Sequence, residues 1–482
     1  MQNQPGRAAR DQALRLPILS LLTVPCSPPR TVMAFPRFCR MDDIRCFVSR
    51  TWQVSWPMTL IMAFEFLISL TDVYVAGKIS KEVQAAYGFV VQIYFISIVI
   101  ANALTVGTVS VVSKLFTGQG PGDRERLAVA ASSSLVTAAL AGVTVSAIGL
   151  VCLPFIVGWL NIPEDVKGHV LPLGRIYLVG IFFHYVLITG NGVLRSCQGV
   201  RKSLKTMALV CGCNLLLIFF FVFHTALGYR GIALATAVSV ALGSVLNLRH
   251  LRPFMPAFRR LSWGVVRNIS AIGWPMGLLQ VLWQLGSAAL FLILSMLPEH
   301  SVETLAAFTA GLRIESAIFL PAFAFNMANA VIVGNLLGER KDQEAYRSGL
   351  VTAGIGVGLV SALTILVILN ARWIAGTLSD NEIVVRESIR YIYISLISEP
   401  FMAWGVILGG GLGGAGDTRS VMLRIAAAVW LVRIPLCYVC VTILGLGANS
   451  VWWAMNASQV VQALLLTRRY TGKAWLRVKP HG

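Results

Sequence analysis

Hydrophobic residues occur along this chain in long, nearly uninterrupted stretches, and the alternating pattern of barrel strands is absent. A helix that crosses a bilayer needs about 20 mostly apolar residues. Stretches of about that length recur from residue 54 to residue 467, and the longer ones are expected to tilt or to extend past the bilayer. The twelve predicted spans are residues 54–77, 84–113, 127–159, 171–194, 204–226, 231–249, 270–297, 305–337, 347–376, 387–412, 420–444 and 448–467.

Composition supports the same fold class. Of the 482 residues, 56% are hydrophobic and only 13% are charged, and the mean hydropathy is +0.73. Soluble domains carry roughly 25% charged residues, so this chain cannot cover its apolar residues with a water-soluble surface. A soluble enzyme and a disordered protein are excluded. Because backbone groups in lipid must be hydrogen-bonded within the segment, we predict an all-α, polytopic membrane protein.

The basic residues indicate an orientation. Lys and Arg number 40 against 21 Asp and Glu, a formal net charge of +19. Such an excess can indicate a nucleic-acid partner, but in membrane proteins Lys and Arg gather in cytoplasmic loops. With the N-terminus placed in the cytoplasm, 30 of them fall on the cytoplasmic side and eight on the other. We therefore predict a cell (inner) membrane protein with both termini in the cytoplasm and no nucleic-acid partner.

Residues 1–50 differ from the rest of the chain. The apolar run Leu16–Val24 is too short to span a membrane and is interrupted by Pro17. A signal peptide is disfavoured because no small-residue cleavage site follows. We predict a cytoplasmic extension that is disordered, or a mis-assigned start with Met33 or Met41 as the true first residue. An organellar presequence is a third, less favoured alternative.

The chain contains an internal duplication. Trp56-Pro57-Met58 recurs 218 residues later as Trp274-Pro275-Met276, and Leu194-Arg195-Ser196 matches Leu412-Gly413-Gly414 at the same offset. Six helices per half give both halves the same orientation, so we expect a pseudo-two-fold axis along the membrane normal and alternating access between two bundles. The predicted parts are the extension 1–50, an N-terminal bundle 51–250, a cytoplasmic linker 251–269, a C-terminal bundle 270–470 and a tail 471–482.

Three segments resemble motifs of the multidrug and toxic compound extrusion (MATE) family. They are Leu70 to Gly77 with Asp72, Ala306 to Gly338 with Arg313 and Glu315, and Leu412 to Arg419, in which Gly413 stands where the family usually has Arg. The likeness covers about residues 50–470, and the bacterial branches are the most similar. It implies two six-helix bundles that export organic, often cationic compounds against Na⁺ or H⁺.

Ionisable groups inside the first-half spans are candidate coupling residues, because a charge in the bilayer core is costly. Glu65 and Asp72 are seven residues apart, close to two helical turns, so both point to one side of the first helix. The resemblance implies that Asp72 is the coupling aspartate and that Asn214 lies near it. The two would ligate the ion if it were Na⁺. Some members carry a second acid four positions after this asparagine, where this chain has Ile218. The absence of that acid weakens the case for a sodium site.

The second half departs from one branch of the family. That branch has a glutamate where this chain has Trp283 and an aspartate where it has Met402. Glu315 and Glu399 remain candidate coupling residues there, with Arg313 and Arg433 as candidate counter-charges. We expect the substrate cavity between the bundles to involve His184, Trp283, Gln284 and Met402.

These features predict a secondary active multidrug exporter that antiports organic compounds against H⁺ or Na⁺. We favour H⁺, because Na⁺ needs several oxygen ligands and a proton needs one acid. No cofactor is expected, the partners are small organic molecules and the bilayer, and a monomer is the default. The alternative within the superfamily is a lipid-linked saccharide flippase. A membrane-embedded enzyme is disfavoured, since no paired catalytic motif such as His-Glu-x-x-His occurs.

Overall fold

The computed structural model describes residues 44–118, 120, 122–159, 163–255, 261–297, 300–378 and 381–477. Within these ranges the chain is helical and contains no strand. The predictions for residues 1–43 and for the end of the tail lie outside the described residues. Residues 44–50, which we had assigned to the N-terminal extension, already belong to the first helix, because α1 begins at Ile44.

The first half holds six long helices. They are α1 (Ile44–Ile79), α2 (Lys81–Thr117), α3 (Asp123–Trp159), α4 (Glu164–Ser196), α5 (Val200–Phe223) and α6 (Arg230–Leu251), followed by the short 3₁₀ helix η1 (Arg252–Phe254).

The helices of the second half are interrupted more often than those of the first half. It comprises α7 (Trp263–Ser295), α8 (Ser301–Gly338), α9 (Asp342–Leu369), α10 (Ala371–Leu378), α11 (Glu382–Ser395), η2 (Leu396–Ser398), α12 (Glu399–Gly414), α13 (Thr418–Ala427), η3 (Ala428–Arg433), α14 (Ile434–Tyr438), η4 (Val439–Ile443), α15 (Ala448–Thr471) and η5 (Ala474–Arg477).

Prolines account for breaks inside two predicted spans. The span 387–412 consists of α11 and α12, joined by a 3₁₀ turn that ends next to Pro400 in the first turn of α12. The span 420–444 contains two π-helical segments on either side of α14, which holds Pro435 near its start. A proline has no N–H to donate to the preceding turn, which favours such a rearrangement, although α1, α3, α4, α7 and α8 continue through their internal prolines.

Eleven helices or helix pairs of the described chain are long and apolar enough to cross a membrane. The twelfth predicted span, 448–467, is the helix α15, which is not among them. The reason is that α15 carries several polar side chains that face the protein interior and lower its mean hydropathy, although it also exposes Trp453 and Leu464. Its buried polar residues are Asn456, Ser458, Gln459 and Gln462.

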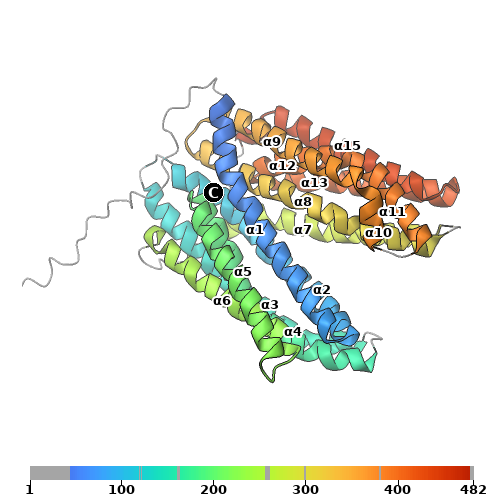
Figure 1. Ribbon diagram of the computed structural model, residues 1–482. Helices are drawn as coiled ribbons and strands as arrows, with labels where there is room; N and C mark the ends of the chain where they lie inside the picture. The colour runs from blue at the N-terminus through green and yellow to red at the C-terminus, as the bar shows by residue number, and fades with distance from the viewer. Residues whose placement is uncertain are drawn as a thin grey trace, which may run out of the picture. The chain divides into compact units, whose positions relative to one another are not determined.

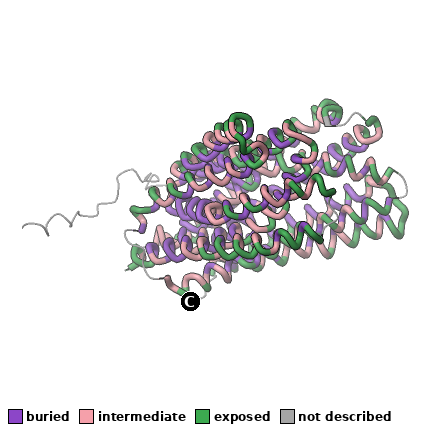
Figure 2. The backbone as a smooth tube through the Cα atoms, turned by 90° about the horizontal axis from the view of Figure 1, so that it is seen from below, coloured by how far each residue is buried: buried purple, intermediate pink, exposed green. Residues whose placement is uncertain are grey.

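The helices of each half pack mainly on one another, as Figure 1 shows for α1–α6 (blue to green) and for α7–α15 (yellow to red). In the first half α4 contacts α2, α3 and α6, and in the second half α12 contacts α8, α9 and α15. Figure 2 shows buried and exposed positions mixed along the same helices. Large apolar side chains such as Phe155, Leu216 and Leu431 are exposed, as expected of a surface that faces lipid.

The two halves meet along α2, which contacts both α7 and α8. Glycines allow the close approach: a Cβ on Gly107 would collide with the carbonyl oxygen of Ile269, and one on Gly273 with that of Ala103. Small residues let helix backbones approach closely in membranes.

Hydrogen bonds between the halves gather at one end of the helices. Thr51 bonds Thr352 at 3.0 Å, and Lys114 donates to the carbonyl of Ala415 at 2.8 Å. Thr117 donates to the carbonyl of Asn335 at 2.6 Å. These residues lie next to the start of α1 and to the α2–α3, α8–α9 and α12–α13 connections, which the charge pattern assigns to the cytoplasm.

Candidate ion-coupling site

Asp72 lies in the interior of the first half with 3% of its surface exposed. Three hydroxyl groups, one each from α2, α4 and α6, donate hydrogen bonds to its Oδ2. Tyr87 lies at 3.4 Å, Tyr177 at 3.2 Å and Thr236 at 3.2 Å from that oxygen. The packing of α2, α4 and α6 therefore places three donors around one carboxylate oxygen.

Asn214 completes this cluster from α5. Its amide Nδ2 donates to the hydroxyl of Thr236 at 3.1 Å. Thr236 therefore connects Asn214 to Asp72, and the asparagine lies near the aspartate, as the resemblance implied. In the described chain, Asp72 Oδ1 and Asn214 Oδ1 are buried without a hydrogen-bond partner. Buried polar atoms are nearly always paired. Each of the two oxygens therefore has unused capacity to accept a hydrogen bond or to ligate a cation.

The neighbourhood of this cluster is apolar. Ile218, where some family members carry an acid, is fully buried in the hydrophobic core of the first half. The sequence did not single out Tyr87, Tyr177 or Thr236. Tyr87 falls within a segment that recurs in the second half with Phe308 in its place, and that difference was the available signal for a polar role.

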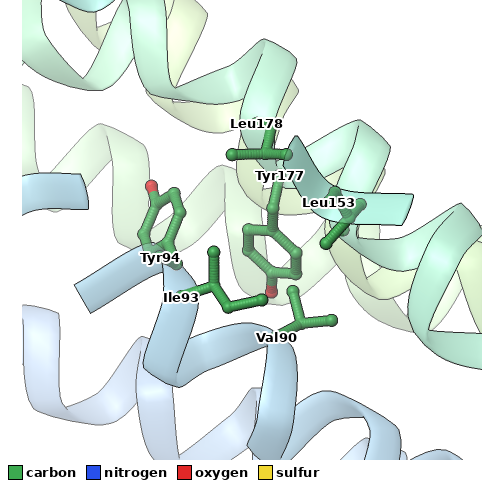
Figure 3. A pocket seen from close by; sticks show the side chains of 7 residues that line it. Val90, Ile93, Tyr94, Leu153, Tyr177 and Leu178 are labelled. Atoms are coloured by element: carbon green, nitrogen blue, oxygen red, sulfur yellow. The ribbon is translucent and has the colours of Figure 1, made fainter. Parts of the chain in front are cut away.

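His184 lies close to the cluster through Tyr94. The Tyr94 hydroxyl and His184 Nδ1 are hydrogen-bonded, and the Tyr94 ring packs edge-on against Tyr177 with centroids 5.1 Å apart. Figure 3 shows Tyr94 and Tyr177 at a small cavity of about 10 Å³ that is otherwise lined by apolar side chains. A cavity of that size holds at most one water molecule.

Glu65 and Asp72 have different surroundings. Glu65 is exposed, and it lies within electrostatic range of Arg195 on α4. The Arg195 side chain is buried, and it contacts Met327 of α8 at 2.9 Å between Nη1 and Sδ. Glu65 therefore lies near the boundary between the halves, whereas Asp72 lies inside the first half.

The second half contains a separate cluster of buried charges. Glu315 accepts a hydrogen bond from the Tyr391 hydroxyl at 2.5 Å, and Glu399 is 2% exposed with its Oε2 unpartnered in the described chain. Arg433 lies within electrostatic range of both carboxylates. Its Nε donates to Ser458 at 2.8 Å. The structure thus brings together three of the residues that the sequence proposed.

Of the remaining predicted residues in the second half, Trp283 contacts this second cluster. Trp283 offers its ring to the Arg433 guanidinium, 5.6 Å from the centroid. Met402 is buried and Gln284 is exposed. Arg313 is also exposed, so of the two arginines only Arg433 lies with the carboxylates. In the described residues there is no group of three or more His, Cys, Asp or Glu side chains that could hold a metal ion.

Comparison with known proteins agrees with this architecture. A "Probable multidrug resistance protein NorM" of Bradyrhizobium diazoefficiens is 26% identical over 445 residues, which cover 87% of this chain and 92% of that protein. A MOP superfamily transporter from Pyrococcus furiosus superposes with a TM-score of 0.84 at 20% identity, covering 94% of this chain and 99% of that one. An outward-facing multidrug resistance MATE family transporter gives 0.83 at 20% identity, with the same coverage.

The family model described as MatE matches residues 57–221 and 275–439, one match in each half. The first match takes in Asp72, Tyr87, Tyr177 and Asn214 but not Thr236, and the second takes in Glu315, Glu399 and Arg433. The chain therefore belongs to the MatE family of multi-pass membrane transporters and is not an enzyme.

Proposed function

We propose that this protein is a secondary active exporter of organic, often cationic compounds, driven by inward movement of H⁺. It acts as a monomer without a cofactor. Both termini lie in the cytoplasm, α15 is the twelfth span, and the two six-helix bundles are related by a pseudo-two-fold axis. The substrate class is suggested by the multidrug resistance protein to which the chain is similar.

The observation that carries the proposal is the environment of Asp72. Three hydroxyls donate to one of its oxygens and none to the other. As an anion, Asp72 keeps the donors from α2, α4 and α6 directed at it. When Oδ1 takes up a proton the charge disappears, and hydrogen bonds to a neutral acceptor are about half as strong. Protonation therefore changes how tightly the first-half helices are held together.

The contacts between the halves supply the second part of the cycle. The hydrogen bonds from Thr51, Lys114 and Thr117 close the end that we assign to the cytoplasm. This arrangement corresponds to the state in which substrate leaves and a proton enters from outside. A ligand shifts such an equilibrium only by its different affinity for the two states. Binding of a proton to Asp72 and binding of substrate must therefore favour opposite arrangements.

Two features favour H⁺ over Na⁺. The hydroxyls around Asp72 direct their hydrogens at its carboxylate, whereas a cation would need their oxygens. In addition, Ile218 removes the second acid of a full sodium site. If the ion were Na⁺, Asp72 and Asn214 would be its ligands.

A cationic substrate fits the exposed acid at the boundary between the halves. The Glu65 side chain is exposed and is electrostatically coupled to Arg195. An organic cation would compete with Arg195 as the counter-charge of Glu65. His184, Trp283, Gln284 and Met402 remain proposed cavity residues.

The experiment is accumulation of a fluorescent cationic dye by inverted membrane vesicles under either a pH gradient or a Na⁺ gradient. We expect uptake with the pH gradient alone and its loss in Asp72→Asn. Uptake driven only by Na⁺ would overturn the choice of ion. The absence of dye movement under both gradients would contradict the multidrug assignment and favour a lipid-linked saccharide flippase.

A further inference from the structure

Three arginines surround a surface cavity in the second half, at the end of the helices opposite to the contacts between the halves. The cavity has a volume of about 390 Å³ and lies between α10 and α11, which contact each other (Figure 1). We propose that it binds the phosphate headgroup of an anionic phospholipid from the outer leaflet. Its lining residues are Arg372, Glu382, Val385, Arg386, Ile389, Arg390 and Tyr393.

The lining of the cavity carries an excess of positive charge that the described residues do not neutralise. Arg390 is paired with Glu387 at 2.7 Å, but in the described chain Arg372 and Arg386 make no ion pair or hydrogen bond. Glu382 is the one acid among the lining residues. Two guanidinium groups are therefore free to bind an anion. The fork of a guanidinium matches phosphate oxygens in a bidentate manner.

The geometry of α11 creates this charged face. Glu382, Arg386 and Arg390 follow one another at intervals of four residues, so they lie on one side of the helix. Glu387 is buried and holds Arg390 in place. Arg372 joins from α10, on the opposite wall of the cavity. Charges from two helices therefore converge on one space.

The surroundings place the cavity at the membrane surface. The end of α9 and the start of α10 expose Leu369 (77%) and Trp373 (72%), and Tyr393 is also exposed. Leucines this exposed are expected to face lipid chains. Exposed Trp and Tyr gather at the level of the lipid headgroups. An arginine-lined cavity beside such residues lies at the depth of the lipid phosphate groups. The acyl chains of the lipids hold these phosphates at that depth.

The location in the outer leaflet rests on the proposed orientation, but phosphate recognition does not. A lipid is favoured over free phosphate because Val385, Ile389 and Tyr393 form part of the lining. Apolar side chains contribute nothing to an inorganic ion, whereas they can pack against the glycerol and upper acyl carbons of a lipid. The volume lies within the usual range of small-molecule sites, about 300–1,000 Å³.

The test is lipid binding to the purified full-length protein, measured by titrating it with phosphatidylglycerol or phosphatidylcholine and recording bound lipid by native mass spectrometry. We expect preference for phosphatidylglycerol and a drop of at least tenfold in its apparent affinity for the double variant Arg372→Gln/Arg386→Gln. Each basic contact to an anionic lipid corresponds to about a fivefold change in affinity. Arg175→Gln is the matched control, since Arg175 is exposed outside the cavity.

Several outcomes would overturn the proposal. Equal binding of the two lipids, or unchanged phosphatidylglycerol binding in the double variant, would exclude a headgroup site. Inorganic phosphate that competes with the lipid and binds equally well in an arginine-dependent manner would indicate a soluble-anion site instead. Arg386→Lys keeps the charge and should retain part of the phosphatidylglycerol binding. This variant keeps the proposal testable if the double variant is poorly folded. Dye transport is measured in the same variants. Loss of lipid preference in a protein that transports dye would contradict this proposal alone, whereas absence of dye transport in the wild type would contradict the exporter assignment.

Discussion

The guanidinium of Arg433 lies over the indole ring of Trp283, 5.6 Å from its centroid. Trp283 occupies the position at which one branch of the family carries a glutamate. In this chain the acids of the second half are Glu315 and Glu399, and the same arginine is electrostatically coupled to both. The face of the Trp283 ring thus contacts the Arg433 guanidinium, whose charge balances Glu315 and Glu399.

Removal of Arg433 should therefore destabilise the second half. Arg433→Met leaves the buried Glu399 and the half-buried Glu315 without a counter-charge, and breaking a buried charged group typically costs about 3–5 kcal/mol. We expect a clear drop in the melting temperature of the purified protein. The triple variant Arg433→Met/Glu315→Gln/Glu399→Gln should recover most of it. A triple variant as unstable as the single one would show that Arg433 acts through packing alone.

The close approach of α2 and α7 makes Gly107 sensitive to a single methyl group. Gly107→Ala places a Cβ against the backbone of Ile269, and overpacking of this kind costs about 1–3 kcal/mol. We expect lower thermal stability and reduced transport, because the seam between the halves is disturbed. Gly88→Ala in the same helix is the control, since its Cβ would meet nothing within 4 Å. Equal effects of the two substitutions would contradict this role of the seam.

The hydroxyls around Asp72 should tune coupling without being indispensable. Tyr177→Phe removes one donor to Oδ2 and leaves Tyr87 and Thr236 in place. Hydrogen bonds to charged groups contribute about 1.5–3 kcal/mol, so we expect proton-driven dye transport to fall several-fold but to remain measurable. Tyr74→Phe, on the exposed face of α1, the helix that carries Asp72, should be neutral. Transport that is unaffected in Tyr177→Phe would argue against the Asp72 cluster as the coupling site.

A cross-link at the end that we assign to the cytoplasm should arrest the cycle. The side-chain oxygens of Thr51 and Thr352 are 3.0 Å apart across the two halves. Cysteines at both positions are therefore close enough to be oxidised to a disulfide. We expect the oxidised double variant to lose transport and to regain it with reductant, while each single variant stays active. Continued transport by fully cross-linked protein would contradict alternating access at this seam.

The fold was largely predictable because a bilayer demands long apolar helices, and these are visible in the sequence. Internal breaks were not predicted, since a hydrophobic run continues unchanged through Pro400 and Pro435 while the backbone rearranges. The start of α1 was also placed too late. Residues 44–50 are helical although Arg45 and Arg50 interrupt the apolar pattern, because a helix continues past the bilayer where charges are tolerated.

The site was predicted in part. Carboxylates inside spans are rare, so Asp72, Glu315 and Glu399 could be selected from the sequence alone. Their partners could not, because hydroxyl side chains such as Tyr177 and Thr236 are common in apolar helices. Only the packing of α2, α4 and α6 shows which of them reach Asp72. Similarly, the sequence recorded Trp283 as the loss of an acid, and only the structure shows that its ring contacts Arg433.

Exchange of protons for an organic cation at Asp72 is tested most directly in proteoliposomes that contain the purified protein and a trapped pH-sensitive dye. An imposed gradient of transported cation, with no initial pH gradient and no Na⁺, should drive protons in the opposite direction in the wild-type protein. The same gradient should produce no proton movement in Asp72→Asn. Cation transport without any proton movement in the wild type, or equal proton movement in Asp72→Asn, would contradict proton-coupled export through this residue.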